Sequence, residues 1–121
     1  MPKLLNDHAI EQYHEEGYYF PIRVLDQSQV ASARGQLEEF EAKQGGPIGG
    51  ALRNKSHLLF TWVDELMRTT TILDAVENLI GPDILCWNTF FWVKEPQSDS
   101  FVSWHQDLRY WGLDTNDLVT V

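Results

Sequence analysis

Apolar side chains in the first two thirds of the chain recur every three or four residues, which is the spacing of one face of an α-helix. Polar residues that can cap a helix precede most of these stretches, and glycine follows three of them. The pattern therefore predicts four helices. Their expected bounds are Asn6 or Asp7 to about Glu16, Asp26 or Ser28 to Gly45, Phe60 to Met67, and Thr69 or Thr70 to Ile80.

Shorter stretches that are rich in β-branched and aromatic residues are typical of strands, and most of them follow Pro82. Four strands are predicted. They cover Tyr18 to Val24, Ile84 to Val93, Phe101 to Asp107, and Leu118 to Val121. Helices over about 1–82, followed by strands over about 83–121, indicate an α+β fold.

Length and composition indicate one folded domain over residues 1–121, with 43% hydrophobic and 22% charged residues. The formal net charge of −9 disfavours binding to nucleic acid or to an anionic membrane. The N-terminus lacks the apolar stretch of a signal peptide, and no apolar run is long enough to span a bilayer. We therefore expect a cytoplasmic protein. With Cys86 as the only cysteine, an internal disulfide and a cysteine-based zinc site are excluded.

Aromatic residues are concentrated near the C-terminus. Eight of the 15 aromatic side chains fall within residues 87–111, which is about a fifth of the chain. They are Trp87, Phe90, Phe91, Trp92, Phe101, Trp104, Tyr110 and Trp111. Such a concentration indicates a packed core, a binding site or both.

The sequence Trp104-His105-Gln106-Asp107 carries the sharpest chemical signal. In a strand, side chains two residues apart point to the same face, so His105 and Asp107 would converge while Gln106 points away. An imidazole and a carboxylate placed in this way can supply two adjacent ligands to one metal ion, as in the facial triad of non-haem iron oxygenases. The alternative to a metal site is that the pair forms an ordinary hydrogen bond at the surface, or that His105 is a core histidine whose nitrogens are hydrogen-bonded within the protein.

A longer stretch gives this pair a context. The motif Trp-Asn-Thr-Phe-Phe-Trp-Val-Lys-Glu-Pro over 87–96, the Trp-His-Gln-Asp-Leu-Arg-Tyr-Trp block over 104–111 and Asp-Leu-Val-Thr-Val over 117–121 resemble the phytanoyl-CoA dioxygenase family. The helix that ends in Glu-Glu-Gly-Tyr and the Leu25-Asp26 helix start are also similar to it. The resemblance covers nearly the whole chain. It implies an Fe(II)- and 2-oxoglutarate-dependent oxygenase on a double-stranded β-helix, a jelly-roll or cupin-like fold.

The resemblance also implies roles for particular residues. His105 and Asp107 match the first two iron ligands, and Lys94 and Phe90 are candidates for binding the co-substrate 2-oxoglutarate. The expected substrate pocket is formed by aromatic side chains. They are Trp92, Trp104, Tyr110 and Trp111. The aspartate at the second ligand position predicts a hydroxylase rather than a halogenase, in which a small residue leaves room for chloride.

Two parts of the family pattern are missing. The third iron ligand, a histidine, and the arginine that binds 2-oxoglutarate follow far downstream in the family, whereas the other histidines here, His8, His14 and His57, all lie upstream of His105. We therefore expect this chain to be the N-terminal part of a longer dioxygenase domain, with an incomplete β-helix and little activity by itself. The acidic charge favours a small organic substrate over a CoA ester, with dioxygen as the other partner.

Two other functions stay open at this stage. The chain could be a non-catalytic fragment or a pseudoenzyme, in which the aromatic cluster serves as a binding or oligomerisation surface and open strand edges allow self-association. A hydrolytic metal site is less favoured, because the sequence holds no His-Glu-x-x-His or comparable cluster.

Overall fold

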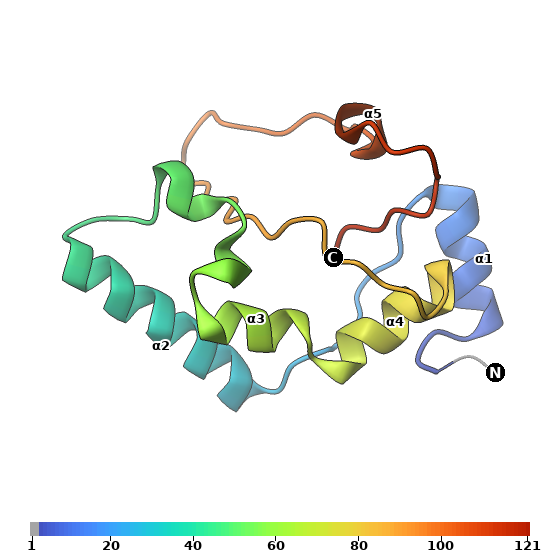
Figure 1. Ribbon diagram of the computed structural model, residues 1–121, viewed down its shortest axis with the longest axis horizontal. Helices are drawn as coiled ribbons and strands as arrows, with labels where there is room; N and C mark the ends of the chain where they lie inside the picture. Colours follow the sequence, from blue (N-terminus) through green and yellow to red (C-terminus); the bar gives the residue numbers. More distant parts are fainter. Residues whose placement is uncertain (1–2) are drawn as a thin grey trace.

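The computed structural model describes residues 3–121. Its regular secondary structure consists of helices, which are connected by loops (Figure 1). The α-helices are α1 (Asp7–Glu16), α2 (Gln27–Gln44), α3 (Thr61–Met67), α4 (Thr70–Ile80) and α5 (Leu108–Trp111). Two short 3₁₀-helices, η1 (Gly50–Arg53) and η2 (Ser56–Leu58), connect α2 to α3. Among residues 3–121, no helix combines the length and the apolar character that crossing a membrane requires.

The four predicted helices are confirmed. In α1 and α2 the start and stop signals act locally. Asn6 caps α1 by accepting a hydrogen bond from the Ala9 backbone N–H, and Asp26 caps α2 through a reciprocal capping box with Gln29. The first two helices end at Gly17 and Gly45, each with φ near +80°. A residue with a Cβ adopts this left-handed conformation only at a cost, so glycine suits both ends.

The packed core is small and divides into two contact regions. In the first, α1 and α4 bring together buried Leu5, Ala9 and Ala75. The side chain of Asn78 in α4 reinforces this contact by accepting hydrogen bonds from the backbone N–H groups of Leu4 and Leu5. These bonds secure the segment that leads into α1 against α4, and Figure 1 shows the two helices side by side.

The second contact region joins α2, α3 and the loop after α4 through aromatic rings. Phe40 of α2 meets Phe60 edge to face, with ring centroids 4.8 Å apart. Phe60 in turn neighbours Trp62 of α3, and Trp62 lies 5.8 Å from Phe91. This series of ring contacts places the segment around Phe91, in the aromatic-rich part of the chain over 87–111, against the helices.

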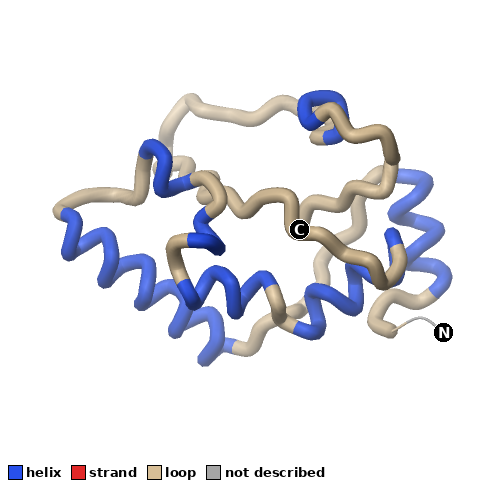
Figure 2. Tube along the Cα trace, viewed as in Figure 1, coloured by secondary structure: helices blue, strands red, loops and turns tan. Residues whose placement is uncertain are grey.

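The four predicted strands are absent from the described residues, so the β half of the expected α+β fold is not observed there. Residues 18–24, 84–93, 101–106 and 118–121 run as loop (Figure 2). The one β contact among residues 3–121 is an isolated antiparallel bridge between Asn54 and Phe90. Strand propensity records the fit of a side chain to a pleated surface, and a strand exists only where a second strand completes its ladder of hydrogen bonds. Within residues 3–121, no such ladder forms.

Candidate metal site

His105 and Asp107 lie together where the loop over 101–106 meets the short helix α5. The Asp107 backbone is already helical, with φ −60° and ψ −38°, and His105 Nε2 lies 2.9 Å from Asp107 Oδ1. The structure thus brings the predicted pair into contact, although the prediction that a regular strand does this is wrong. Convergence arises instead at the junction between loop and helix.

Hydrogen bonds fix which nitrogen of His105 faces the carboxylate. Nδ1 lies 2.8 Å from the carbonyl oxygen of Ser103, and a carbonyl can only accept, so Nδ1 carries the donated proton. The bond to Ser103, followed by the contact with Asp107, raises the pKa of His105 above its usual value. Nε2 faces the Asp107 carboxylate and is therefore the nitrogen that would bind a metal ion, which requires this nitrogen to be free of a proton.

The Asp107 carboxylate has a second partner that the sequence did not reveal. The hydroxyl of Thr120 donates a hydrogen bond to Asp107 Oδ2 over 2.6 Å. Each carboxylate oxygen is therefore engaged by a different side chain. Asp107 and Thr120 are 13 positions apart, and no local sequence pattern signals this contact.

One imidazole nitrogen and one carboxylate oxygen suit the donor set of a non-haem Fe(II) site, so the two residues fit part of the implied iron centre. Within residues 3–121, no third histidine, cysteine, aspartate or glutamate joins them. The arrangement therefore offers two of the three protein ligands of a facial triad. Metal binding at this pair stays a prediction.

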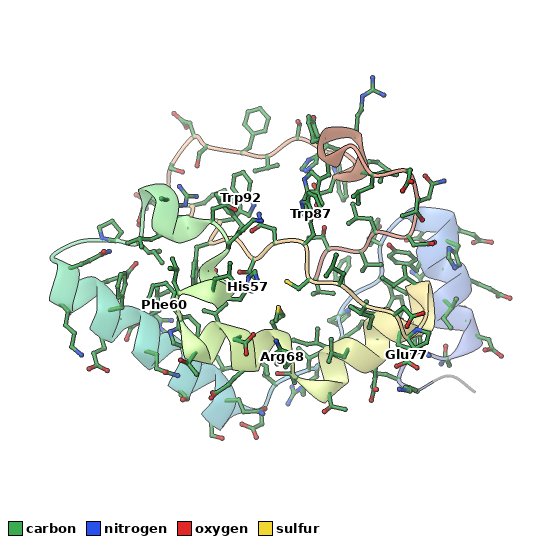
Figure 3. All side chains as sticks on the ribbon, viewed as in Figure 1. His57, Phe60, Arg68, Glu77, Trp87 and Trp92 are labelled. Atoms are coloured by element: carbon green, nitrogen blue, oxygen red, sulfur yellow. The ribbon has the colours of Figure 1, made fainter. Side chains whose placement is uncertain are left out.

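The predicted pocket residues gather in two places rather than one. Tyr110 packs edge to face on His105, with ring centroids 6.0 Å apart, and Trp111 stacks on Trp87. Phe90 and Trp92 form a separate pair, with their centroids 4.9 Å apart. In Figure 3, Trp92 lies toward the η1 side and Trp87 below α5.

The other two predicted residues are open to solvent. The side chain of Trp104 is 92% exposed, although its ring lies 5.9 Å from that of Tyr18, and Lys94 is exposed as well. An open hollow lined by residues 23–28 contains none of the predicted site residues. Tyr110 is the predicted pocket residue whose ring packs on His105. Together with Phe90, Trp92, Phe101 and Trp104 it forms what we call the exposed aromatic surface, which lies in more than one place and does not enclose the His105–Asp107 pair.

A polar cluster that sequence reasoning missed fixes the segment that carries Phe90 and Trp92. Thr89 Oγ1 lies 2.9 Å from Ser56 Oγ, accepts from the His57 backbone N–H over 3.0 Å, and lies 2.8 Å from His57 Nδ1. Ser56, at 1% exposure, is the most buried polar residue of the described chain. This cluster anchors residues 88–91 to the η2 turn.

Arg53 adds a second anchor to the same segment. Its backbone carbonyl accepts from the Phe91 N–H over 3.0 Å, and its Nε donates to the Phe91 carbonyl over 2.8 Å. The guanidinium also lies 5.1 Å from the centre of the Phe90 ring, which is a cation–π distance. Because side chains alternate here, Thr89 and Phe91 face the helices while Phe90 and Trp92 face outward.

The chain matches the phytanoyl-CoA dioxygenase (PhyH) family over residues 1–121. It belongs to that family. A protein of Stutzerimonas stutzeri, named "Probable alpha-ketoglutarate-dependent hypophosphite dioxygenase", is 31% identical over 84 residues. The match covers 69% of this chain and 29% of that protein, so the chain spans less than a third of the relative's length. No solved structure matches this member of the phytanoyl-CoA dioxygenase family.

This family is a family of dioxygenases, and the match agrees with the resemblance drawn from the motifs of the chain. The name of the relative points to 2-oxoglutarate as the co-substrate of that protein. The family also implies a cupin-like fold, which the mostly helical described residues do not display.

Proposed function

We propose that this chain supplies His105 and Asp107 as two ligands to the iron of an Fe(II)- and 2-oxoglutarate-dependent dioxygenase, which hydroxylates a small organic substrate. The observation that carries the proposal is the 2.9 Å separation between His105 Nε2 and Asp107 Oδ1. Membership of a dioxygenase family supports it. Bound iron, together with 2-oxoglutarate and dioxygen, supplies the oxidising power for such a reaction.

The chain's own residues have three tasks in this proposal. His105 and Asp107 hold the metal, while Tyr110 packs edge to face on the His105 ring and supports the position of that ligand. Phe90 and Lys94 contribute to co-substrate binding, the first by apolar contact and the second by its positive charge. The tryptophans at 92, 104 and 111 would line the substrate pocket and exclude water from it.

The name of the relative suggests one specific compound to include when candidate substrates are tested. That protein is named for hypophosphite, a small phosphorus oxyanion, so hypophosphite belongs in the panel beside small organic acids and alcohols. We propose the organic class because the pocket residues expected from the sequence are aromatic and largely uncharged.

Metal binding tests the proposal directly. We expect the chain to bind Fe(II) under anaerobic conditions, and both His105→Ala and Asp107→Ala to remove that binding. His8→Ala, which changes an exposed histidine in α1, is the matched control and should leave it intact. Equal Fe(II) affinity in wild type and Asp107→Ala would show that the ligand assignment is wrong. Because only two ligands are present, we expect no enzyme-like turnover of 2-oxoglutarate by the chain alone.

A second function is favoured by the exposed surface area. The accessible surface is 9576 Å². A folded monomer of 14.0 kDa is expected to expose only about 6,700 Å². The excess, about 2,900 Å², is more than one partner buries in a standard protein interface, about 800 Å². We propose, as the alternative, that the chain acts as a binding or oligomerisation module through its aromatic surface.

A further inference from the structure

Thr120 reaches the carboxylate of Asp107 from a separate part of the chain. Its hydroxyl donates to Oδ2 over 2.6 Å, while His105 Nε2 lies 2.9 Å from Oδ1 of the same group. The two contacts occupy different oxygens. Together they hold the carboxylate in one orientation, in which Oδ1 faces the imidazole.

Orientation matters for a carboxylate ligand because two torsions set it. The side chain can occupy any of three staggered χ1 rotamers, and the terminal torsion has a broad, nearly two-fold energy profile. A partner on one carboxylate oxygen restrains both torsions, and χ1 is the one that decides toward which neighbour the carboxylate points. Metal ligands are commonly held by outer hydrogen-bond partners, and loss of such a partner weakens metal binding. A 2.6 Å separation is typical of a hydroxyl donating to an ionised oxygen. The donor sits on Oδ2, so it does not compete with a metal ion for Oδ1.

We propose that Thr120 is a positioning residue, which orients the Asp107 carboxylate so that Oδ1 and His105 Nε2 face one metal-binding point. The inference rests on the proposed function, because it takes these two residues as metal ligands. It adds a residue outside the His-x-Asp motif to the site. It also gives the segment over 118–121 a part in the site's geometry.

The type of residue fits this task. Threonine is branched at Cβ, so its χ1 torsion is stiff and its hydroxyl is presented in a defined direction. Valine has nearly the same shape but lacks the donor, and serine keeps the donor but lacks the branch. Thr120 is exposed, so neither substitution disturbs a packed core. The two variants therefore separate the hydrogen bond from the shape of the side chain.

Titration with Mn(II) alone tests the proposal, because the EPR signal of the free aqua ion reports how much metal is unbound. We expect Thr120→Val to weaken Mn(II) binding by roughly 10- to 100-fold. Thr120→Ser should restore affinity to within a few-fold of wild type. A Thr120→Val affinity equal to that of wild type, in a chain whose Asp107→Ala variant has lost binding, would overturn the proposal for Thr120 while the metal site stands.

A second measurement separates failure of the metal site from failure of the positioning role. In metal-free protein, the Hα–Hβ scalar couplings of Asp107 report its χ1 rotamer. We expect one rotamer in wild type and Thr120→Ser, and averaged couplings in Thr120→Val. If Asp107→Ala binds Mn(II) as wild type does, the proposed metal site is wrong. Unchanged couplings in Thr120→Val would then refute the positioning role independently.

Discussion

The hydroxyl oxygens of Thr89 and Ser56 lie 2.9 Å apart and join segments that are 33 residues apart in the sequence. Ser56 is almost fully buried, and Thr89 is its only side-chain hydrogen-bond partner among the described residues. The pair links the η2 turn to the stretch that presents Phe90 and Trp92 outward. Any displacement of Thr89 would therefore move the exposed aromatic surface relative to the helices.

Thr89→Val should destabilise the fold, because it leaves the buried Ser56 hydroxyl without a partner. Loss of one partner of a buried hydrogen bond costs about 1–3 kcal/mol. We expect the urea midpoint to fall accordingly, and the backbone amides of residues 88–91 to exchange faster with deuterium. Thr89→Ser keeps the hydroxyl and is the matched control, with a midpoint close to wild type. A Thr89→Val protein with the wild-type midpoint and exchange would show that the cluster carries no stability.

The contrast between this cluster and the helices shows what the sequence could and could not predict. The helix at Asp26 was predictable because its capping partner Gln29 lies three residues away, and Gly45 ends it through its own backbone conformation. Thr89 was not recognised, because its partners come from a turn 32 or 33 residues away. The same holds for Thr120, which meets Asp107 across 13 residues.

The predicted strands are not observed for a related reason. Residues 84–93 have the composition of a strand, but composition cannot supply the neighbouring strand that completes a ladder, and the described residues form none around them. The His105–Asp107 contact was predicted from strand alternation and is present, although a turn into α5 produces it. A spacing of two residues thus allows convergence in more than one backbone geometry.

The capping box at Asp26 predicts a measurable pH dependence of α2. The Gln29 backbone N–H, followed by the Ser28 hydroxyl, donates to the Asp26 carboxylate and lowers its pKa below 3.8. A carboxyl whose pKa is lower in the folded state stabilises that state fully above its unfolded value. This contribution disappears as the pH falls through the lowered value. Wild type should therefore be more stable than Asp26→Asn near neutral pH, and this difference in stability should disappear in strongly acidic solution.

The measurement compares the thermal midpoints of wild type and Asp26→Asn by far-UV circular dichroism between neutral pH and about pH 2. Asparagine still accepts the capping hydrogen bond but cannot ionise, so other carboxyl groups cancel in the difference. We expect wild type to be the more stable protein near neutrality and the difference to vanish at the acid end. A difference that stays constant over this range would contradict the role of the carboxylate charge.

Cys86 should be a slow nucleophile in the folded chain. Burial raises the pKa of its thiol, and its Sγ lies 3.7 Å from the carbonyl oxygen of Asn88. Because the thiolate is the reactive form, alkylation by iodoacetamide should be several-fold slower in native protein than in denaturant, with its pH midpoint displaced upward. Thr89→Val, which loosens the neighbouring segment, should narrow this difference. Equal rates in native and denatured protein would show that Cys86 is not protected.

The exposed aromatic surface predicts concentration-dependent self-association. Phe101, Trp92 and Trp104 expose 80%, 68% and 92% of their surface, and large apolar side chains exposed in this way favour contact with another surface. Sedimentation velocity should therefore show a mass that rises with protein concentration.

Because aromatic side chains dominate interface energies, Trp104→Ser should shift the association equilibrium toward the monomer. Leu58→Ser, at an apolar position in η2 that is 71% exposed, should leave the equilibrium unchanged. A chain that stays monomeric over the whole concentration range would exclude self-association through this surface and restrict the alternative function to binding a different partner.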